Sequence, residues 1–108
     1  MSGSDPYDWL QSWYVAQCNG DWEHRHGIRL ETMDNPGWLL MIDLVGTPLE
    51  GKPFQTIRQG VPCNDLAQWQ ACGSWRVCEV AESRFKGACG PLDLAAVIDD
   101  FRRWSLSP

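Results

Sequence analysis

The sequence has no long apolar run, and this absence excludes a membrane-spanning helix. Its longest uninterrupted apolar stretch extends from Trp38 to Ile42, whereas a helix that crosses a bilayer needs roughly 20 apolar residues. The first residues, Met1 to Asp5, also lack the basic and apolar segments of a secretory signal. We therefore expect no contact with a membrane and a cytoplasmic location.

Positive charge is scarce in this chain. Nine Lys and Arg residues stand against fourteen Asp and Glu residues, which gives a formal net charge of −5 and an isoelectric point near 4.8. The basic residues are scattered, and only Arg102 and Arg103 are adjacent. Proteins that bind nucleic acids concentrate positive charge, because release of counterions drives their affinity. The composition therefore argues against direct binding of nucleic acid, and it suits a basic protein partner or simply solubility.

The chain also lacks the paired cysteines that mark zinc and redox sites, because no two cysteines are separated by two residues. An odd number of cysteines excludes complete pairing within the chain, and a protein without an export signal keeps its thiols reduced. We therefore expect five free thiols, no bound metal and no cofactor. The cysteines are Cys18, Cys63, Cys72, Cys78 and Cys89.

The 108 residues that are present suffice for a single domain, residues 1–108, with one core. Helices are predicted at both ends. Asp5-Pro6 combines an N-cap carboxylate with a proline at the first helical position, and apolar residues follow at mostly helical spacing over about residues 6–18. A second helix is expected to open at Gly90-Pro91 and to bury Leu94, Val97, Ile98, Phe101 and Trp104. Its solvent-facing side is expected to carry Asp93, Asp99, Asp100, Arg102 and Arg103.

Strands are predicted between the two helices. Residues 27–33 alternate between apolar and polar, and Asp34-Asn35-Pro36-Gly37 indicates a type II turn in which Gly37 takes a positive φ. The return strand, Trp38 to Val45, is apolar on both faces except at Asp43, which suggests a central position. Shorter strands are expected at residues 54–58, 75–80 and 84–88, and a loop with a helical turn near 65–70 at residues 59–73. The order predicts an α+β fold: an antiparallel sheet of about five strands with an N-terminal and a C-terminal helix packed on it.

Four segments in the first half of the chain together resemble the sequence pattern of a known family. They read WLQSWY from Trp9, QCNGDWEH from Gln17, DNPGW from Asp34 and IDL from Ile42. Together they resemble the immunity protein 53 family of bacterial polymorphic-toxin systems, most densely over about residues 7–45. The combination of GDWEH with DNPGW is the specific part, and the stretch Gln59 to Gly73 departs from the pattern. The resemblance implies a protein that is not an enzyme and that binds and neutralises a cognate toxin by stoichiometric protein–protein interaction.

Candidate contact residues lie in the same half of the chain. If the toxin is basic and nuclease-like, acidic side chains near the first hairpin would meet it, and opposite charges would speed the encounter. The candidates are Asp21, Trp22, Glu23, His24, Glu31, Asp34, Asn35 and Asp43. Each of several candidates also has a structural interpretation: Trp22 as a core residue, Glu23 as a clamp that accepts backbone N–H groups, and Asp34 and Asn35 as turn-forming residues.

Two other classes of function stay open on the residues alone. A small cysteine-dependent enzyme of sulfurtransferase type would use the segment Cys72 to Cys78 with its arginine, and a hydrolase would use Glu23 with His24 for acid–base chemistry. Neighbours on an extended segment point to opposite sides, which disfavours that pair. A zinc-stabilised adaptor would use Cys18, His24 and His26, although their spacing matches none of the usual zinc patterns.

Overall fold

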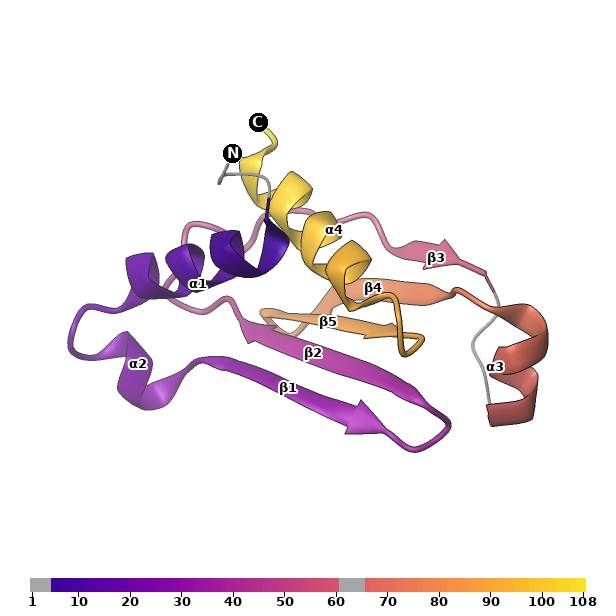
Figure 1. Cartoon of the computed structure of the whole chain (residues 1–108). Coiled ribbons are helices and arrows are strands. Elements are labelled where there is room, and N and C mark those ends of the chain that lie inside the picture. Colours follow the sequence, from indigo (N-terminus) through magenta and orange to yellow (C-terminus); the bar gives the residue numbers. More distant parts are fainter. Residues whose placement is uncertain (1–4, 61–65) are drawn as a thin grey trace.

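The computed structural model describes residues 5–60 and 66–108, and Figure 1 shows how their helices and strands are arranged. In chain order the elements are α1 (Pro6–Gln17), α2 (Trp22–Arg25), β1 (Ile28–Met33), β2 (Gly37–Asp43), β3 (Ile57–Gln59), α3 (Leu66–Cys72), β4 (Arg76–Ala81), β5 (Arg84–Cys89) and α4 (Leu94–Leu106). Among the described residues, none of the helices has both the length and the apolar character that a membrane crossing requires.

The five strands form one sheet in the order β1-β2-β5-β4-β3, and every neighbouring pair is antiparallel. The hairpins β1–β2 and β4–β5 join in the middle, where β2 pairs with β5. The central position predicted for the return strand is confirmed, since β2 lies between β1 and β5. This arrangement confirms the predicted α+β fold with a five-stranded antiparallel sheet.

The core lies between the sheet and the two terminal helices, which pack together on the same face of the sheet (Figure 1). Aromatic rings join the two helices, because the rings of Trp9 and Trp13 on α1 lie 5.8 and 5.1 Å from the ring of Phe101 on α4 and meet it edge-on. Its fully buried apolar side chains include Leu40 and Ile42 of β2, Phe85 of β5, and Val97, Ile98 and Phe101 of α4.

The ends of the two terminal helices follow their capping signals only in part. Asp5 caps α1 as predicted, since its Oδ1 accepts the N–H groups of Tyr7 and Asp8. The second helix begins at Leu94 rather than at Gly90-Pro91. The N–H of Gly90 donates to the carbonyl of Trp75, and Asp93 Oδ2 accepts the N–H of Trp75, so this segment forms a turn tied to the start of β4.

Glu23 and His24 were treated as neighbours on an extended segment, and this interpretation is wrong, because both belong to the helical turn α2. Side chains hold this turn by bonding to nearby backbone groups. Asn19 Oδ1 accepts the N–H groups of Asp21 and Trp22, both at 2.9 Å, and the Glu23 carboxylate accepts the N–H of Asn19 at 2.9 Å. Such local bonds offer the backbone an alternative to an extended strand.

The turn assignment of Gly37 is also wrong, since this glycine has no positive φ and is the first residue of β2. Glycine is required at this position for a steric reason. A Cβ at this position would overlap with the backbone carbonyl oxygen of Cys89 in the neighbouring strand β5. Gly37 is therefore required for a close approach of two backbones rather than for a special turn conformation.

Asp100 was expected on the solvent-facing side of the second helix, and this prediction is wrong. Its side chain is fully buried, at 0% exposure, between α4 and β4. Two arginines balance its charge: Arg76 Nε–H donates to it at 2.5 Å and Arg103 NH2 at 2.6 Å. A buried carboxylate with two charged donors avoids the cost of an unpaired buried charge.

The middle of the chain matches its prediction in outline. The helical turn expected near residues 65–70 is α3, and the short strand expected at 54–58 is β3, which begins three residues later at Ile57. The predicted loop at 59–73 includes residues 61–65, which lie outside the described residues. The strands predicted at 75–80 and 84–88 are confirmed as β4 and β5.

Candidate functional site

The face of the sheet opposite α1 and α4 has no helix packed over it in the part of the chain that the structure describes (Figure 1). We call this surface the open face. Alternate residues of all five strands form it, because successive side chains of a strand point to opposite sides. Strand register places them in two rows that cross the sheet, one of Glu31, Leu39, Ala88, Val77 and Arg58, and one of Arg29, Met41, Lys86 and Glu79, with Asp43 and Arg84 beyond the second row.

The first row is apolar in its middle and charged at its ends. Leu39, Ala88 and Val77 are half-buried neighbours on three adjacent strands, while Glu31 and Arg58 are exposed on the two edge strands. An apolar centre with a polar rim is the general anatomy of a protein–protein interface. The open face therefore has the arrangement of a surface that binds another protein.

The charge of the open face differs from that of the whole chain. Its two rows and their continuation carry four basic side chains and three acidic ones: Arg29, Arg58, Arg84 and Lys86 against Glu31, Asp43 and Glu79. The chain as a whole has a net charge of −5. The excess of acidic residues therefore lies outside the open face.

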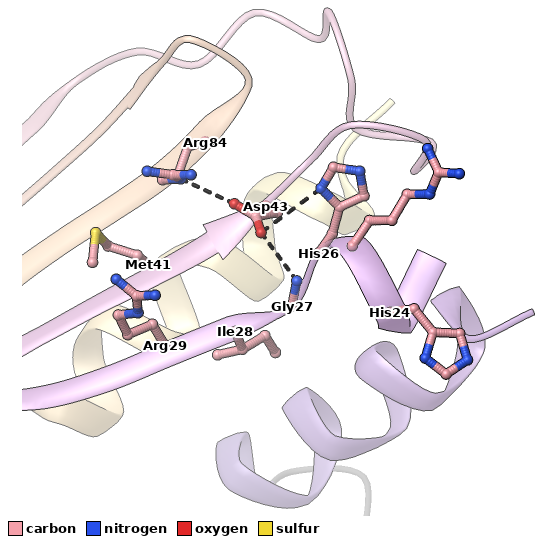
Figure 2. A pocket seen from close by; sticks show the side chains of 9 residues that line it. His24, His26, Gly27, Ile28, Arg29, Met41, Asp43 and Arg84 are labelled. Carbon is pink, nitrogen blue, oxygen red and sulfur yellow. Dashed lines mark hydrogen bonds and ion pairs between the residues drawn. The ribbon is translucent and has the colours of Figure 1, made fainter. Parts of the chain in front are cut away.

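A cleft of about 320 Å³ lies at the end of the open face next to α2 (Figure 2). The chain leaves α2 at His26 and Gly27 and enters β1, and this bend forms one wall of the cleft. The ends of β2 and β5 form the other wall. The lining residues are His24, Arg25, His26, Gly27, Ile28, Arg29, Met41, Asp43 and Arg84.

Asp43 is the acidic residue of the cleft, and its carboxylate already has several donors (Figure 2). It faces Arg84 across the β2–β5 pair, and Arg84 Nε–H donates to Oδ1 at 3.0 Å. The backbone N–H of Gly27 donates to Oδ2 at 3.0 Å, and His26 Nδ1 lies 3.9 Å from the same oxygen. Asp43 thus joins β2 to β5 and to the segment that precedes β1.

The basic side chains of the cleft are more exposed than Asp43. The side chains of Arg25 and Arg84 are 72% and 54% exposed, against 24% for Asp43. Arg25 forms an ion pair with Asp21 at 3.3 Å, one turn earlier in the chain. Arg29 lies opposite Met41 in the β1–β2 register and forms no ion pair within the described residues.

Two of the predicted contact residues have structural roles. Trp22 is only 4% exposed, its Nε1–H donates to the carbonyl of Val45 at 2.8 Å, and its ring meets that of Trp13 edge-on at 6.3 Å. Glu23 is a loop clamp, as one sequence interpretation had it. Bonds from backbone N–H groups, first its own and then those before α2, lower the pKa of its carboxyl, which suits a fixed anion rather than a general base.

The other predicted contact residues divide between the two ends of β1. Asp21, the N-cap of α2, and His24 within α2 are exposed, and His24 lines the cleft together with Asp43. Asp34 and Asn35 lie in the hairpin turn between β1 and β2, at the far end of β1. Glu31 lies between these two groups on the open face. The arginines of the cleft were not among the candidates, although the alternation of residues 27–33 already placed Arg29 on the polar side of its strand.

The residues considered for catalysis are not arranged for it. Cys78 lies in β4 and faces the core, where burial first and the nearby Asp100 second raise the pKa of its thiol. Burial also raises the pKa of Cys89 to about 12. A thiol that stays protonated is neither a nucleophile nor a metal ligand. The cleft lining includes the His26–Asp43 pair but no serine, threonine, cysteine or lysine.

Cys18, His24 and His26 do not form a zinc site in the described residues, since no group of three or more potential metal ligands is found within 5–60 and 66–108. The segment Cys72 to Cys78 does not form an anion-binding loop either. Residues 73–75 connect α3 to β4. The N–H of Gly73 donates to the carbonyl of Trp69 and the N–H of Trp75 donates to Asp93 Oδ2, so these groups do not remain for an anion.

Comparison with known families finds a match for this chain. No curated protein and no solved structure matches the chain. A family model described as Immunity protein 53 matches residues 7–105, which include every helix and strand except the first residue of α1 and the last of α4. The match therefore covers the fold as a whole, and it agrees with the resemblance of the first half. The chain belongs to the immunity protein 53 family, and this membership implies that it neutralises a toxin.

Proposed function

We propose that this protein neutralises its cognate toxin by binding it in a one-to-one complex, with the open face as the contact surface. The observation that carries the proposal is the apolar row of Leu39, Ala88 and Val77, which lies at the centre of the open face and has charged residues around it. Burial of such a centre supplies most of the binding free energy of an interface, and its polar rim sets the orientation of the partners.

The open face is held in place by the structure behind it. Its residues alternate along β2 and β5 with Leu40, Ile42 and Phe85, which are fully buried in the core that α4 helps to form. Side chains on a sheet that is fixed from the other side lose little further freedom when a partner binds, so less free energy is spent on ordering them. This rigidity supports an inhibitor that acts by covering its target.

The predicted contact residues differ in their position relative to the open face. Glu31 and Asp43 belong to the open face, Asp21 and His24 border it at α2, and the turn residues Asp34 and Asn35 lie at its other end. Its exposed acidic members, Asp21, Glu31 and Asp34, would meet basic residues of a nuclease-like toxin, whereas the Asp43 carboxylate is already bonded within the cleft. Trp22 and Glu23 support the surface from behind, because one is buried and the other clamps the backbone.

The test is co-expression of the protein with the toxin encoded beside its gene, scored by rescue of growth. Ala88→Arg places a long charged side chain at the centre of the open face, and we expect it to weaken toxin binding by about 100-fold and to abolish rescue, since such centres hold the hot spots. Val15→Arg introduces the same side chain on α1, where Val15 is 66% exposed, and serves as the matched control.

Folding and stoichiometry complete the test. Both variants should keep the melting temperature of the wild type within a few degrees, because each new side chain points into solvent. Titration of toxin activity with the wild-type protein should reach its end point at one equivalent. A folded Ala88→Arg variant that still protects cells would show that the toxin binds elsewhere, and inactivation of excess toxin would show catalysis instead.

A further inference from the structure

We infer that the cleft at the α2 end of the open face binds the carboxylate of an acidic side chain of the toxin. The inference rests on the proposed function and adds to it the chemistry of one contact. Its starting point is the charge of the cleft, whose lining contains three arginines and two histidines but only one acidic residue. In a chain with a net charge of −5, this cleft concentrates positive charge.

Asp43, the acidic residue of the cleft, does not cancel the positive charge that a partner would meet there. Asp43 accepts from Arg84 Nε–H and from the backbone N–H of Gly27, and His26 lies beside it. The two terminal NH2 groups of Arg84 are not part of its bond to Asp43, and the side chain is 54% exposed. Arg29 forms no ion pair within the described residues. Guanidinium donors therefore remain for a second carboxylate.

The placement of these donors suits a carboxylate on a short aliphatic stem. Arg29 and Arg84 stand on β1 and β5, on either side of β2, and Met41 of β2 lies between them (Figure 2). A guanidinium group binds a carboxylate through two parallel N–H···O bonds. The thioether of Met41 gives an adaptable apolar contact for the methylene groups that carry the acid.

A carboxylate fits this cleft better than a phosphate. Asp43 is part of the lining, and its negative charge repels an added anion in proportion to that anion's charge. A carboxylate brings one negative charge, whereas a phosphate brings nearly two at neutral pH. The protein also repels acidic surfaces in general, so a single acid in a basic cleft would fix the register of the complex and select the correct partner.

The first experiment uses small probes on the isotopically labelled full-length protein, followed by NMR. N-acetylglutamate N-methylamide carries the side-chain carboxylate, its glutamine counterpart is the isosteric neutral control, and inorganic phosphate is the competing anion. We expect saturable shifts of the backbone signals of Arg29 and Met41 and of the Nε–H signal of Arg84 with the glutamate probe alone. Saturation by phosphate alone, or no saturable shift with the glutamate probe, would overturn the inference.

Variants connect the probe to the toxin. Arg29→Gln removes a charge that has no partner in the described residues, and the protein should stay folded. We expect it to weaken binding of the glutamate probe at least about fivefold and binding of the toxin about tenfold, as for the loss of a charge-assisted hydrogen bond. Arg102→Gln, on α4 at the opposite face of the sheet, is the matched control and should change neither affinity.

The two proposals fail in different ways. If Ala88→Arg abolishes toxin binding while Arg29→Gln leaves it unchanged, the open face is the interface but the cleft holds no acid of the toxin, and the inference is wrong. If Ala88→Arg leaves toxin binding unchanged, the open face itself is the wrong surface. Loss of toxin binding in both variants, with the Arg102→Gln and Val15→Arg proteins unaffected, supports both.

Discussion

At the scale of single residues, Asp43 organises the candidate site. Its backbone N–H donates to the carbonyl of Gly27 at 3.1 Å, and its carboxylate accepts the N–H of Gly27 and the Nε–H of Arg84, both at 3.0 Å. One residue at the end of β2 therefore fixes the segment before β1 and the first side chain of β5. The shape of the cleft depends on these bonds, because they hold its two walls together.

Gly37 gives a test of packing at one backbone position. Gly37→Ala should lower the free energy of unfolding by about 1–3 kcal/mol, since the added methyl group has no space beside the carbonyl of Cys89 and the two strands must move apart. Gly27→Ala is the control, because nothing lies within 4 Å of a Cβ built there. Urea unfolding measures both. Equal stabilities of the two variants would contradict the close approach of β2 and β5 at this point.

Asp100 gives a test of a buried charge. Asp100→Asn should lower the free energy of unfolding by about 3 kcal/mol, because the arginine charges at Arg76 and Arg103 lose their buried partner. Asp99→Asn is the matched control, one residue earlier on α4. Its ion pair with Arg102 is long, at 3.6 Å, and partly exposed, so its loss should cost no more than about 0.5 kcal/mol. Similar midpoints in urea would mean that the Asp100 cluster contributes little to stability.

These residues also show where single-sequence prediction stops. Asp43 stands out in the sequence as the polar residue of an apolar strand, yet its partners Gly27 and Arg84 lie 16 and 41 positions away. Asp100 has the spacing of a solvent-facing residue on α4, and only the approach of Arg76, 24 positions earlier, explains its burial. Chemistry that depends on such distant pairs has no local signal.

At the scale of elements, α2 is the piece that shapes the candidate site. It has four residues, far fewer than a helix needs to be stable alone in water. Its stability comes from the Asn19 and Glu23 side chains, which bond to nearby backbone N–H groups, and from the burial of Trp22 against α1. The turn can therefore be weakened through one charged side chain.

Glu23 makes the stability of α2 depend on pH. Its folded-state pKa lies below the ordinary value of 4.5, so the ionised form stabilises the fold. This contribution is fully present above pH 4.5 and is lost as the pH falls through the lowered pKa. The wild type should thus melt at a higher temperature than Glu23→Gln at pH 7, and the difference should shrink below pH 4.5. A difference that stays constant down to pH 3 would contradict the clamp.

Elements with local signals are the ones that the sequence predicts well. The cap at Asp5, the alternation of residues 28–33 and the helical spacing of residues 94–104 correspond to α1, β1 and α4. The pairing of β2 with β5 joins two hairpins that are far apart in sequence, and this pairing creates both the open face and the cleft. Some residues of the site could be predicted from the sequence, but the fact that they lie side by side in the fold could not.

At the scale of the whole molecule, the fold separates charge. The open face carries a small excess of basic residues, while the chain has a net charge of −5. A basic toxin would thus be attracted from a distance by the molecule as a whole and would then dock on a surface of mixed charge. Long-range attraction sets the rate of association, whereas close pairs set the lifetime of the complex.

The contribution of particular acidic residues to this attraction can be measured. Asp21→Lys with Glu31→Lys reverses two exposed acids at the border of the open face and on it. If the toxin is basic, the association rate should fall about tenfold at low salt, and its salt dependence should flatten, because charges more than about 8 Å apart are screened at physiological ionic strength. Asp8→Lys with Glu50→Lys makes the same change in net charge outside the open face, and both residues are exposed. Stopped-flow association at two salt concentrations compares the pairs.

A larger effect of the first pair would place the acidic contacts at the open face. Equal effects would mean that net charge alone steers the toxin, and unchanged rates for both pairs would show that the toxin is not basic.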